Sequence, residues 1–150
     1  MAGQDPAPGA LHMKASILAL AATLLVGAAL PSPPRDLPAL GLLESGQWSL
    51  TSRDSPALNR KLCVADARAL LQIEHRNASC TRFVIASSAR EATVHYTCPG
   101  HGHGRTTIRV ESPRLAQIET QGIADKAPFS AMFEARRAGI CPPMAGSIRY

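Results

Sequence analysis

Alternating apolar and polar residues predict that most of the second half of this chain forms β-strands. The first predicted strand, Ser45–Ser52, comes earlier and places Trp48 and Leu50 on one face. Five further strands are predicted at Thr81–Ala86, Ala92–Cys98, Arg105–Glu111, Leu115–Ile123 and Phe129–Arg137. In the last strand, one face carries Phe129, Ala131, Phe133 and Ala135.

One segment follows a helical period instead. In Val64–His75 an apolar stripe recurs at a spacing near 3.6, through Val64, Ala67, Leu70, Leu71 and Ile73. The stretch "SRDSPALNRK" before it contains Asp, Ser, Pro and Asn, which predict a loop. A strand, a helix and then five strands predict an α+β fold. We expect an antiparallel meander sheet of about six strands with one short helix packed on it.

The residues around "SSARE" predict a hairpin with a defined register. If the chain folds back at Ala89, Arg82 faces Tyr96, Val84 faces Val94 and Ala86 faces Ala92. The same register places Cys80 opposite Cys98. Cysteines in a non-hydrogen-bonded pair of this kind lie close enough to form a disulfide.

The N-terminal region has the layout of a secretory signal peptide, which we place at residues 1–29. Met13 and Lys14 precede an apolar run, Ala15–Leu30, that is shorter than the ~20 residues needed to span a bilayer. Met13 is an alternative start, because Met1–His12 contains an acidic residue and no Lys or Arg. Cleavage of the leader and its retention as an anchor both stay open. The predicted location is the periplasm, with membrane contact only through this segment.

The remaining chain divides into three predicted parts. Residues 30–39 are rich in proline and predict an extended linker. Residues 40–141 form one domain of about a hundred residues, a size that supports one modest core. Residues 142–150 predict a loose C-terminal tail.

All four cysteines follow the leader: Cys63, Cys80, Cys98 and Cys141. An exported chain meets an oxidising compartment, so two disulfides are expected. The hairpin register pairs Cys80 with Cys98, which leaves Cys63 for Cys141.

The stretch "HYTCPGHGHGRTT" is the main candidate for chemistry. His95, His101 and His103 are side chains that bind zinc at short spacing, and they make a metal site an alternative hypothesis. Against it, Cys98 is assigned to a disulfide, and the glycines and proline indicate an exposed turn. We therefore predict no metal site, no other cofactor and no catalytic residue.

Charge and motifs exclude several function classes. The net charge is +5, but the arginines are scattered and aromatic residues make up only 4% of the chain. A nucleic-acid surface concentrates basic residues and interleaves aromatics, so nucleic acid is not an expected partner. Neither a Gly-x-Ser-x-Gly motif nor a phosphate-binding glycine loop is present. We predict a non-enzymatic binding or structural module, with an envelope protein or an apolar or anionic ligand as the partner.

Several of these features occur together in a known pattern. In order, they are Gly46-Gln47-Trp48, Cys63-Val64-Ala65-Asp66, Cys80, Cys98, Gly102-His103-Gly104 and Gly139-Ile140-Cys141. This order resembles a family of small exported bacterial proteins, the domain-of-unknown-function family numbered 3617, over Leu43–Cys141. The resemblance implies a Gram-negative periplasmic protein. It supplies no catalytic motif, and its Gly-x-Gly position does not require histidine.

Overall fold

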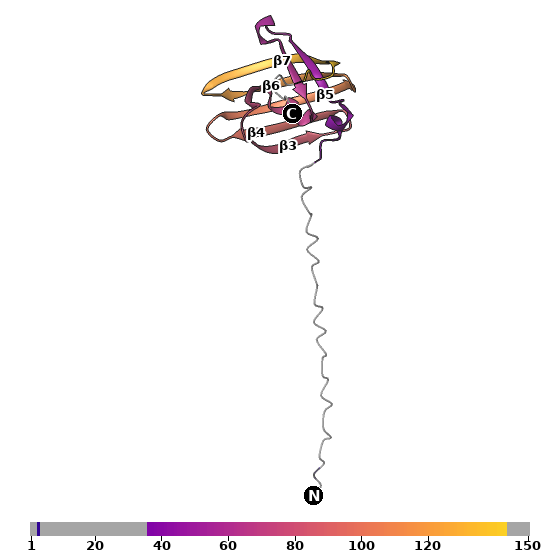
Figure 1. Cartoon of the computed structure of the whole chain (residues 1–150). Helices are drawn as coiled ribbons and strands as arrows, with labels where there is room; N and C mark the ends of the chain where they lie inside the picture. Colours follow the sequence, from indigo (N-terminus) through magenta and orange to yellow (C-terminus); the bar gives the residue numbers. More distant parts are fainter. Residues whose placement is uncertain (1–2, 4–35, 144–150) are drawn as a thin grey trace, which may run out of the picture. The chain divides into compact units, whose positions relative to one another are not determined.

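The computed structural model describes Gly3 and residues 36–143, which form seven strands and three 3₁₀ helices (Figure 1). The strands are β1 (Gly46–Ser52), β2 (Arg60–Val64), β3 (Thr81–Ser87), β4 (Glu91–Cys98), β5 (Gly102–Ser112), β6 (Leu115–Ala124) and β7 (Ala127–Gly139). The helices are η1 (Pro38–Leu42), η2 (Pro56–Leu58) and η3 (Ala67–His75). Apart from Gly3, the predicted signal peptide lies outside the described residues, as do residues 144–150 of the predicted tail.

All seven strands belong to one antiparallel sheet in the order β2-β1-β7-β6-β5-β4-β3. Strands β3 to β7 form a continuous meander, and the last strand then pairs with the first. The predicted antiparallel meander is confirmed, with seven strands in place of about six, but the described residues form a mostly-β fold with 3₁₀ helices in place of the predicted α+β fold. The two edges are β2 and β3, which are adjacent strands in the chain but lie at opposite ends of the sheet order.

Strand β2 is the one that the sequence pattern missed. It lies where the end of the predicted loop meets the start of the predicted helix, and only Leu62 and Val64 in it are buried. Two apolar positions give too short an alternation to identify a strand. These residues form a strand because they pair with β1, where Trp48 faces Leu62.

The predicted helix at Val64–His75 is wrong in type and extent. Val64 belongs to β2, and the helical part is a 3₁₀ segment interrupted at Gln72, whose φ of −130° and ψ of 49° are not helical. Four consecutive residues are buried here: Leu70, Leu71, Gln72 and Ile73. Successive side chains of an α-helix point about 100° apart, so a regular helix that packs on one face against a sheet does not bury four in a row. The break at Gln72 allows this burial.

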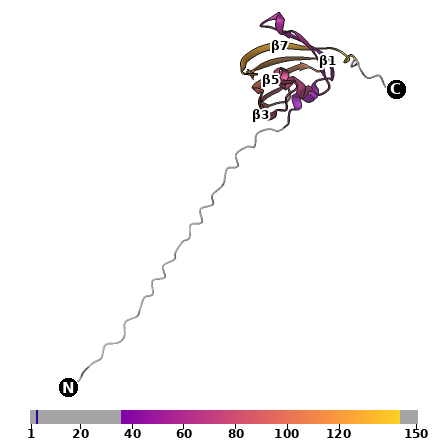
Figure 2. The ribbon, with the colours of Figure 1, turned by 60° about the vertical axis from the view of Figure 1, so that its left-hand side comes forward.

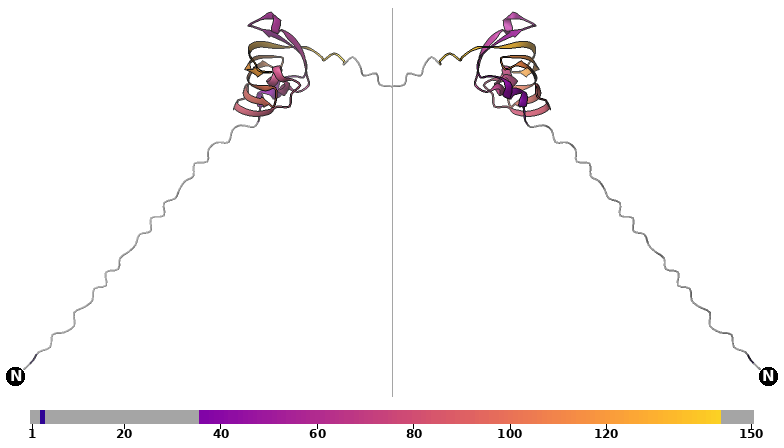
Figure 3. Two further views of the ribbon diagram at one scale, coloured as in Figure 1. Left: turned by 90° about the vertical axis from the view of Figure 1, so that its left-hand side faces the viewer. Right: turned by 90° about the vertical axis from the view of Figure 1, so that its right-hand side faces the viewer.

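The core fills the concave face of the curved sheet, which bends around η1 and η3 (Figures 2 and 3). Trp48, Leu50 and Phe133 from the sheet and Leu70 and Leu71 from η3 are fully buried. Helix η1 adds Ala39 and Leu40. The predicted linker at residues 30–39 therefore extends too far, because Pro38 and Ala39 are already part of the folded domain.

The predicted hairpin is present, and its register is right for most of its length. Arg82 faces Tyr96 and Val84 faces Val94, but a bulge follows, and Ala86 faces Thr93 instead of Ala92. The bulge adds one residue to β3 that periodicity cannot reveal. Among the described residues, none of the helices has the length and apolarity needed to cross a membrane.

Candidate functional site

Both predicted disulfides are present. Cys63 in β2 is bonded to Cys141, which follows β7, with a Cα–Cα distance of 5.5 Å. Residue Gln47, at the start of β1, pairs with Cys63 on one side and with Gly139 on the other. The bond therefore joins the two neighbours of β1 and holds the edge strand β2 to the rest of the sheet.

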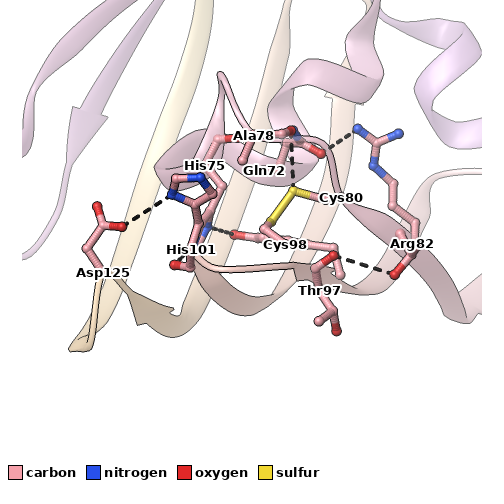
Figure 4. The surroundings of a disulfide bond; sticks show 11 residues. Gln72, His75, Ala78, Cys80, Arg82, Thr97, Cys98, His101 and Asp125 are labelled. Atoms are coloured by element: carbon pink, nitrogen blue, oxygen red, sulfur yellow. Dashed lines mark hydrogen bonds and ion pairs between the residues drawn. A yellow bond between two sulfur atoms is a disulfide. The ribbon is translucent and has the colours of Figure 1, made fainter.

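The second disulfide joins Cys80 and Cys98 across the β3–β4 hairpin, with a Cα–Cα distance of 4.2 Å (Figure 4). This distance is typical of a non-hydrogen-bonded antiparallel pair, as the register predicts. Cys98 is buried, and it also pairs with Gly102 in β5. The bond thus lies beside the histidine-rich turn. The Cys98 sulfur is part of this disulfide and is therefore not a free thiolate that could bind a metal ion.

A buried polar cluster lies next to this disulfide. The His75 ring is 5% exposed and lies between the Tyr96 hydroxyl and the carbonyl oxygen of His101. Nε2 is 3.0 Å from that carbonyl, which can only accept, so Nε2 carries the hydrogen. In the neutral ring Nδ1, 3.2 Å from the Tyr96 oxygen, then accepts a hydrogen bond from the hydroxyl.

Two threonines and a glutamine complete the cluster. Thr106 and Thr120, which face each other on β5 and β6, are fully buried with their hydroxyl oxygens 2.8 Å apart. The Gln72 amide nitrogen donates to the carbonyls of His75 and Ala78, at 3.1 and 3.2 Å. Among the described residues, no buried side-chain nitrogen or oxygen lacks a hydrogen-bond partner. Such a fully hydrogen-bonded cluster fixes the packing of η3 against the sheet.

Close packing explains two of the three glycines of "GHGHG", Gly102 and Gly104. A Cβ atom at Gly104 would overlap the Tyr96 hydroxyl and ring, and one at Gly102 would overlap the Ile123 carbonyl. Gly102 also has a φ of 114°, which side-chain-bearing residues rarely adopt. These glycines make room for Tyr96 and for the neighbouring strand, and their presence needs no ligand.

The three histidines of the metal hypothesis do not converge. The His95 and His103 rings lie side by side on the outer face of the sheet, with centroids 5.8 Å apart. His101 lies in the turn instead, and its Nδ1 is 3.5 Å from a carboxylate oxygen of Asp125 (Figure 4). Within residues 36–143 and at Gly3, no group of three His, Cys, Asp or Glu side chains is placed to hold a metal ion.

Comparisons with protein-family models, with curated proteins and with solved structures found no match to this chain. The resemblance to the family numbered 3617 therefore stays a prediction, and function has to be inferred from the residues themselves.

Sequence reasoning missed His75, Tyr96 and Gln72 as a unit. The available signal was glycine at alternate positions of β5 directly opposite an aromatic residue, because Gly104 faces Tyr96 in the register. Such a pair suggests that the aromatic ring packs directly on the backbone of the glycine, which has no side chain. Nothing in the sequence indicated that His75, from another element, would meet that ring.

We expect the protein to lose stability in alkali because of Tyr96. Burial raises the pKa of the Tyr96 phenol above its ordinary value of 10.0, while hydrogen bonds from Thr120 and Thr106 oppose this more weakly. Above pH 10 the unfolded chain releases this proton and the folded chain keeps it. The free energy of unfolding should then fall by up to about 1.4 kcal/mol per pH unit, until the folded-state pKa is passed.

The measurement uses Tyr150→Phe protein, because Tyr96 and Tyr150 are the chain's two tyrosines. Tyrosinate absorbance then reports Tyr96 alone, and its midpoint in the folded protein should lie above pH 10. Urea unfolding of Tyr96→Phe should show a shallower decline above that pH. A midpoint at or below pH 10 would contradict the assignment of a buried, neutral phenol.

Proposed function

We propose that this chain is exported to the periplasm and that its domain acts by binding and not by catalysis. Two disulfides in a domain of about a hundred residues support the first part, since such bonds form and persist in oxidising compartments. The resemblance to the exported family numbered 3617 agrees with it.

The buried polar cluster is the observation that carries the second part. His75 and Tyr96 are two side chains with acid–base chemistry that lie within 3.2 Å of each other, and both are buried and hydrogen-bonded. A catalytic pair needs access to a substrate. Here the hydrogen bonds join η3 to β4 and to the β4–β5 turn, which is a structural role.

The filled concave face also restricts where a ligand could bind. Side chains from η1 and η3 occupy the inside of the curved sheet, so contacts with a partner have to come from outer surfaces. Several large apolar side chains are exposed there. Phe83 and Ile85 on the edge strand β3 are 56% and 42% exposed, and Met132 on β7 is 44% exposed. Of these, Phe83 and Ile85 share an edge strand, and exposed apolar side chains grouped in this way are typical of interaction surfaces.

Export is tested by expression of the full chain in a Gram-negative host. Intact mass of the periplasmic fraction should give an N-terminus near Leu30, and alkylation should detect no free thiol. Leu24→Arg, which places a charge in the apolar run, is the matched control and should leave full-length protein in the cytosol. Full-length wild-type protein in the cytosol with four reactive thiols would overturn the proposal.

A further inference from the structure

The two edge strands of the sheet, β2 and β3, are far apart in strand order, yet residues from both line one pocket. This pocket has a volume of about 430 Å³ and is lined by Cys63 of β2, Arg82 of β3, and the η3 segment with its flanking residues. We call it the seam pocket. It forms because the curved sheet leaves its two edges on either side of η3.

Positive charge dominates the seam pocket. Its lining contains three guanidinium groups, Arg68, Arg76 and Arg82, and one carboxylate, Asp66. Asp66 forms an ion pair with Arg68 at 3.4 Å, and both side chains are more than 60% exposed. Within the described residues, neither Arg76 nor Arg82 has an ion-pair partner. Two guanidinium groups thus lie at one pocket whose single carboxylate, Asp66, is paired with Arg68.

A hydrogen bond to the buried side chain of Gln72 orients the Arg82 guanidinium group. Gln72 is only 6% exposed, and its amide nitrogen is fixed by two backbone carbonyls, so its oxygen points outward and accepts a hydrogen bond from Arg82 Nη2 (Figure 4). A neutral oxygen orients the guanidinium without cancelling its charge. The remaining N–H groups of Arg82 stay available, and the orientation lowers the entropy that a ligand must remove on binding.

We propose that the seam pocket binds a phosphate group, through Arg82 and Arg76 with Arg68 in support. A phosphate offers oxygen acceptors in three dimensions, which suits guanidinium groups that come from β3 and from the two ends of η3. A carboxylate offers two oxygens in one plane. The inference rests on the proposed binding function and names its ligand class. The phosphate could be a free ion or a lipid headgroup, and the two sources share this chemistry.

The test is a titration of ¹⁵N-labelled oxidised protein with inorganic phosphate at constant ionic strength, followed by amide chemical shifts. We expect shifts concentrated at residues 66–82. Arg76→Gln should weaken binding about tenfold or more, as expected for loss of a charge-assisted hydrogen bond. Arg82→Lys keeps the charge but loses the planar group that Gln72 orients, and it should weaken binding several-fold.

Arg105→Gln is the matched control. Arg105 is exposed on β5, makes no ion pair within the described residues, and its loss changes net charge by the same amount. It should leave affinity within about twofold of wild type, since only general screening is altered. An equal loss in Arg105→Gln and Arg76→Gln, or shifts spread over the whole sheet, would mean unspecific charge attraction and would overturn the proposal.

A second arm separates the two sources of phosphate. Sedimentation with phosphatidylglycerol vesicles is compared with sedimentation with phosphatidylcholine vesicles, for wild type and Arg76→Gln. Binding to phosphatidylglycerol that Arg76→Gln loses supports a lipid headgroup in the seam pocket. Shifts with inorganic phosphate and no vesicle binding support a small anion. Absence of shifts together with vesicle binding that Arg76→Gln leaves unchanged would overturn the site. This result is independent of the export test, which concerns only the leader and the thiols.

Discussion

Removing the Cys63–Cys141 disulfide by double substitution to Ala is expected to lower the free energy of unfolding by about 4–5 kcal/mol. The bond closes a loop with a sequence separation of 78 residues, and long loops lose the most entropy when they are closed in the unfolded chain. A domain of this size has a stability of roughly 5–15 kcal/mol. The melting temperature should therefore fall by more than about 15 °C.

The Cys80–Cys98 bond provides the internal control. Its sequence separation is 18 residues, which corresponds to about 3 kcal/mol in the same entropic account. Urea unfolding of both double Ala variants should rank Cys63–Cys141 as the larger loss. The reverse ranking would indicate that the buried hairpin bond contributes through packing in the native state more than through chain entropy.

Trp48→Ala is expected to destabilise the domain by about 3–5 kcal/mol. Trp48 is fully buried on the concave face, and its indole nitrogen donates a hydrogen bond to the Glu44 carbonyl at 3.0 Å. Truncation removes a large apolar area and leaves a cavity between β1 and the 3₁₀ segments. It also leaves the carbonyl without this donor.

Trp48→Phe separates the two contributions. It keeps an aromatic ring but removes the hydrogen bond, and it should cost about 1–3 kcal/mol. Both variants lack the chain's only tryptophan, so circular dichroism must follow the urea transition. A loss below about 1 kcal/mol for Trp48→Ala would show that the concave face repacks easily, contrary to the tight core described above.

Features that depend on local alternation could be predicted from sequence. Thr81–Ala86 and Ala92–Cys98 form the β3–β4 hairpin because period-two patterning and one short turn specify both strands and their register. The same register identified Cys80 as the partner of Cys98, and elimination then identified Cys63–Cys141. The prediction failed at Ala86, where the bulge inserts a residue that leaves no trace in the pattern of apolar positions.

The candidate site could not be predicted in the same way. His75 and Tyr96 are 21 residues apart in the chain and meet only because η3 packs on the concave face. The histidines His95, His101 and His103 look like one cluster in the sequence, yet only His95 and His103 lie side by side, and His101 lies apart from them in the turn beside Asp125. Nearness along the chain is a poor guide to nearness in a sheet, where alternate residues face opposite sides.

The sequence by itself determined the meander of strands and the two disulfides, because each depends on local pattern or on a count of four cysteines. The leader stays a prediction, since it lies outside the described residues apart from Gly3. Tertiary structure alone decided three other features: strand β2, the 3₁₀ form of η3 and the seam pocket. Strand β2 exists because β1 offers a pairing edge, and η3 adopts its broken form because four successive residues must be buried under a curved sheet. The seam pocket depends on sheet curvature, which brings Cys63 and Arg82 to one surface. Curvature arises from the twist and packing of all seven strands together, and no single segment of the chain encodes it.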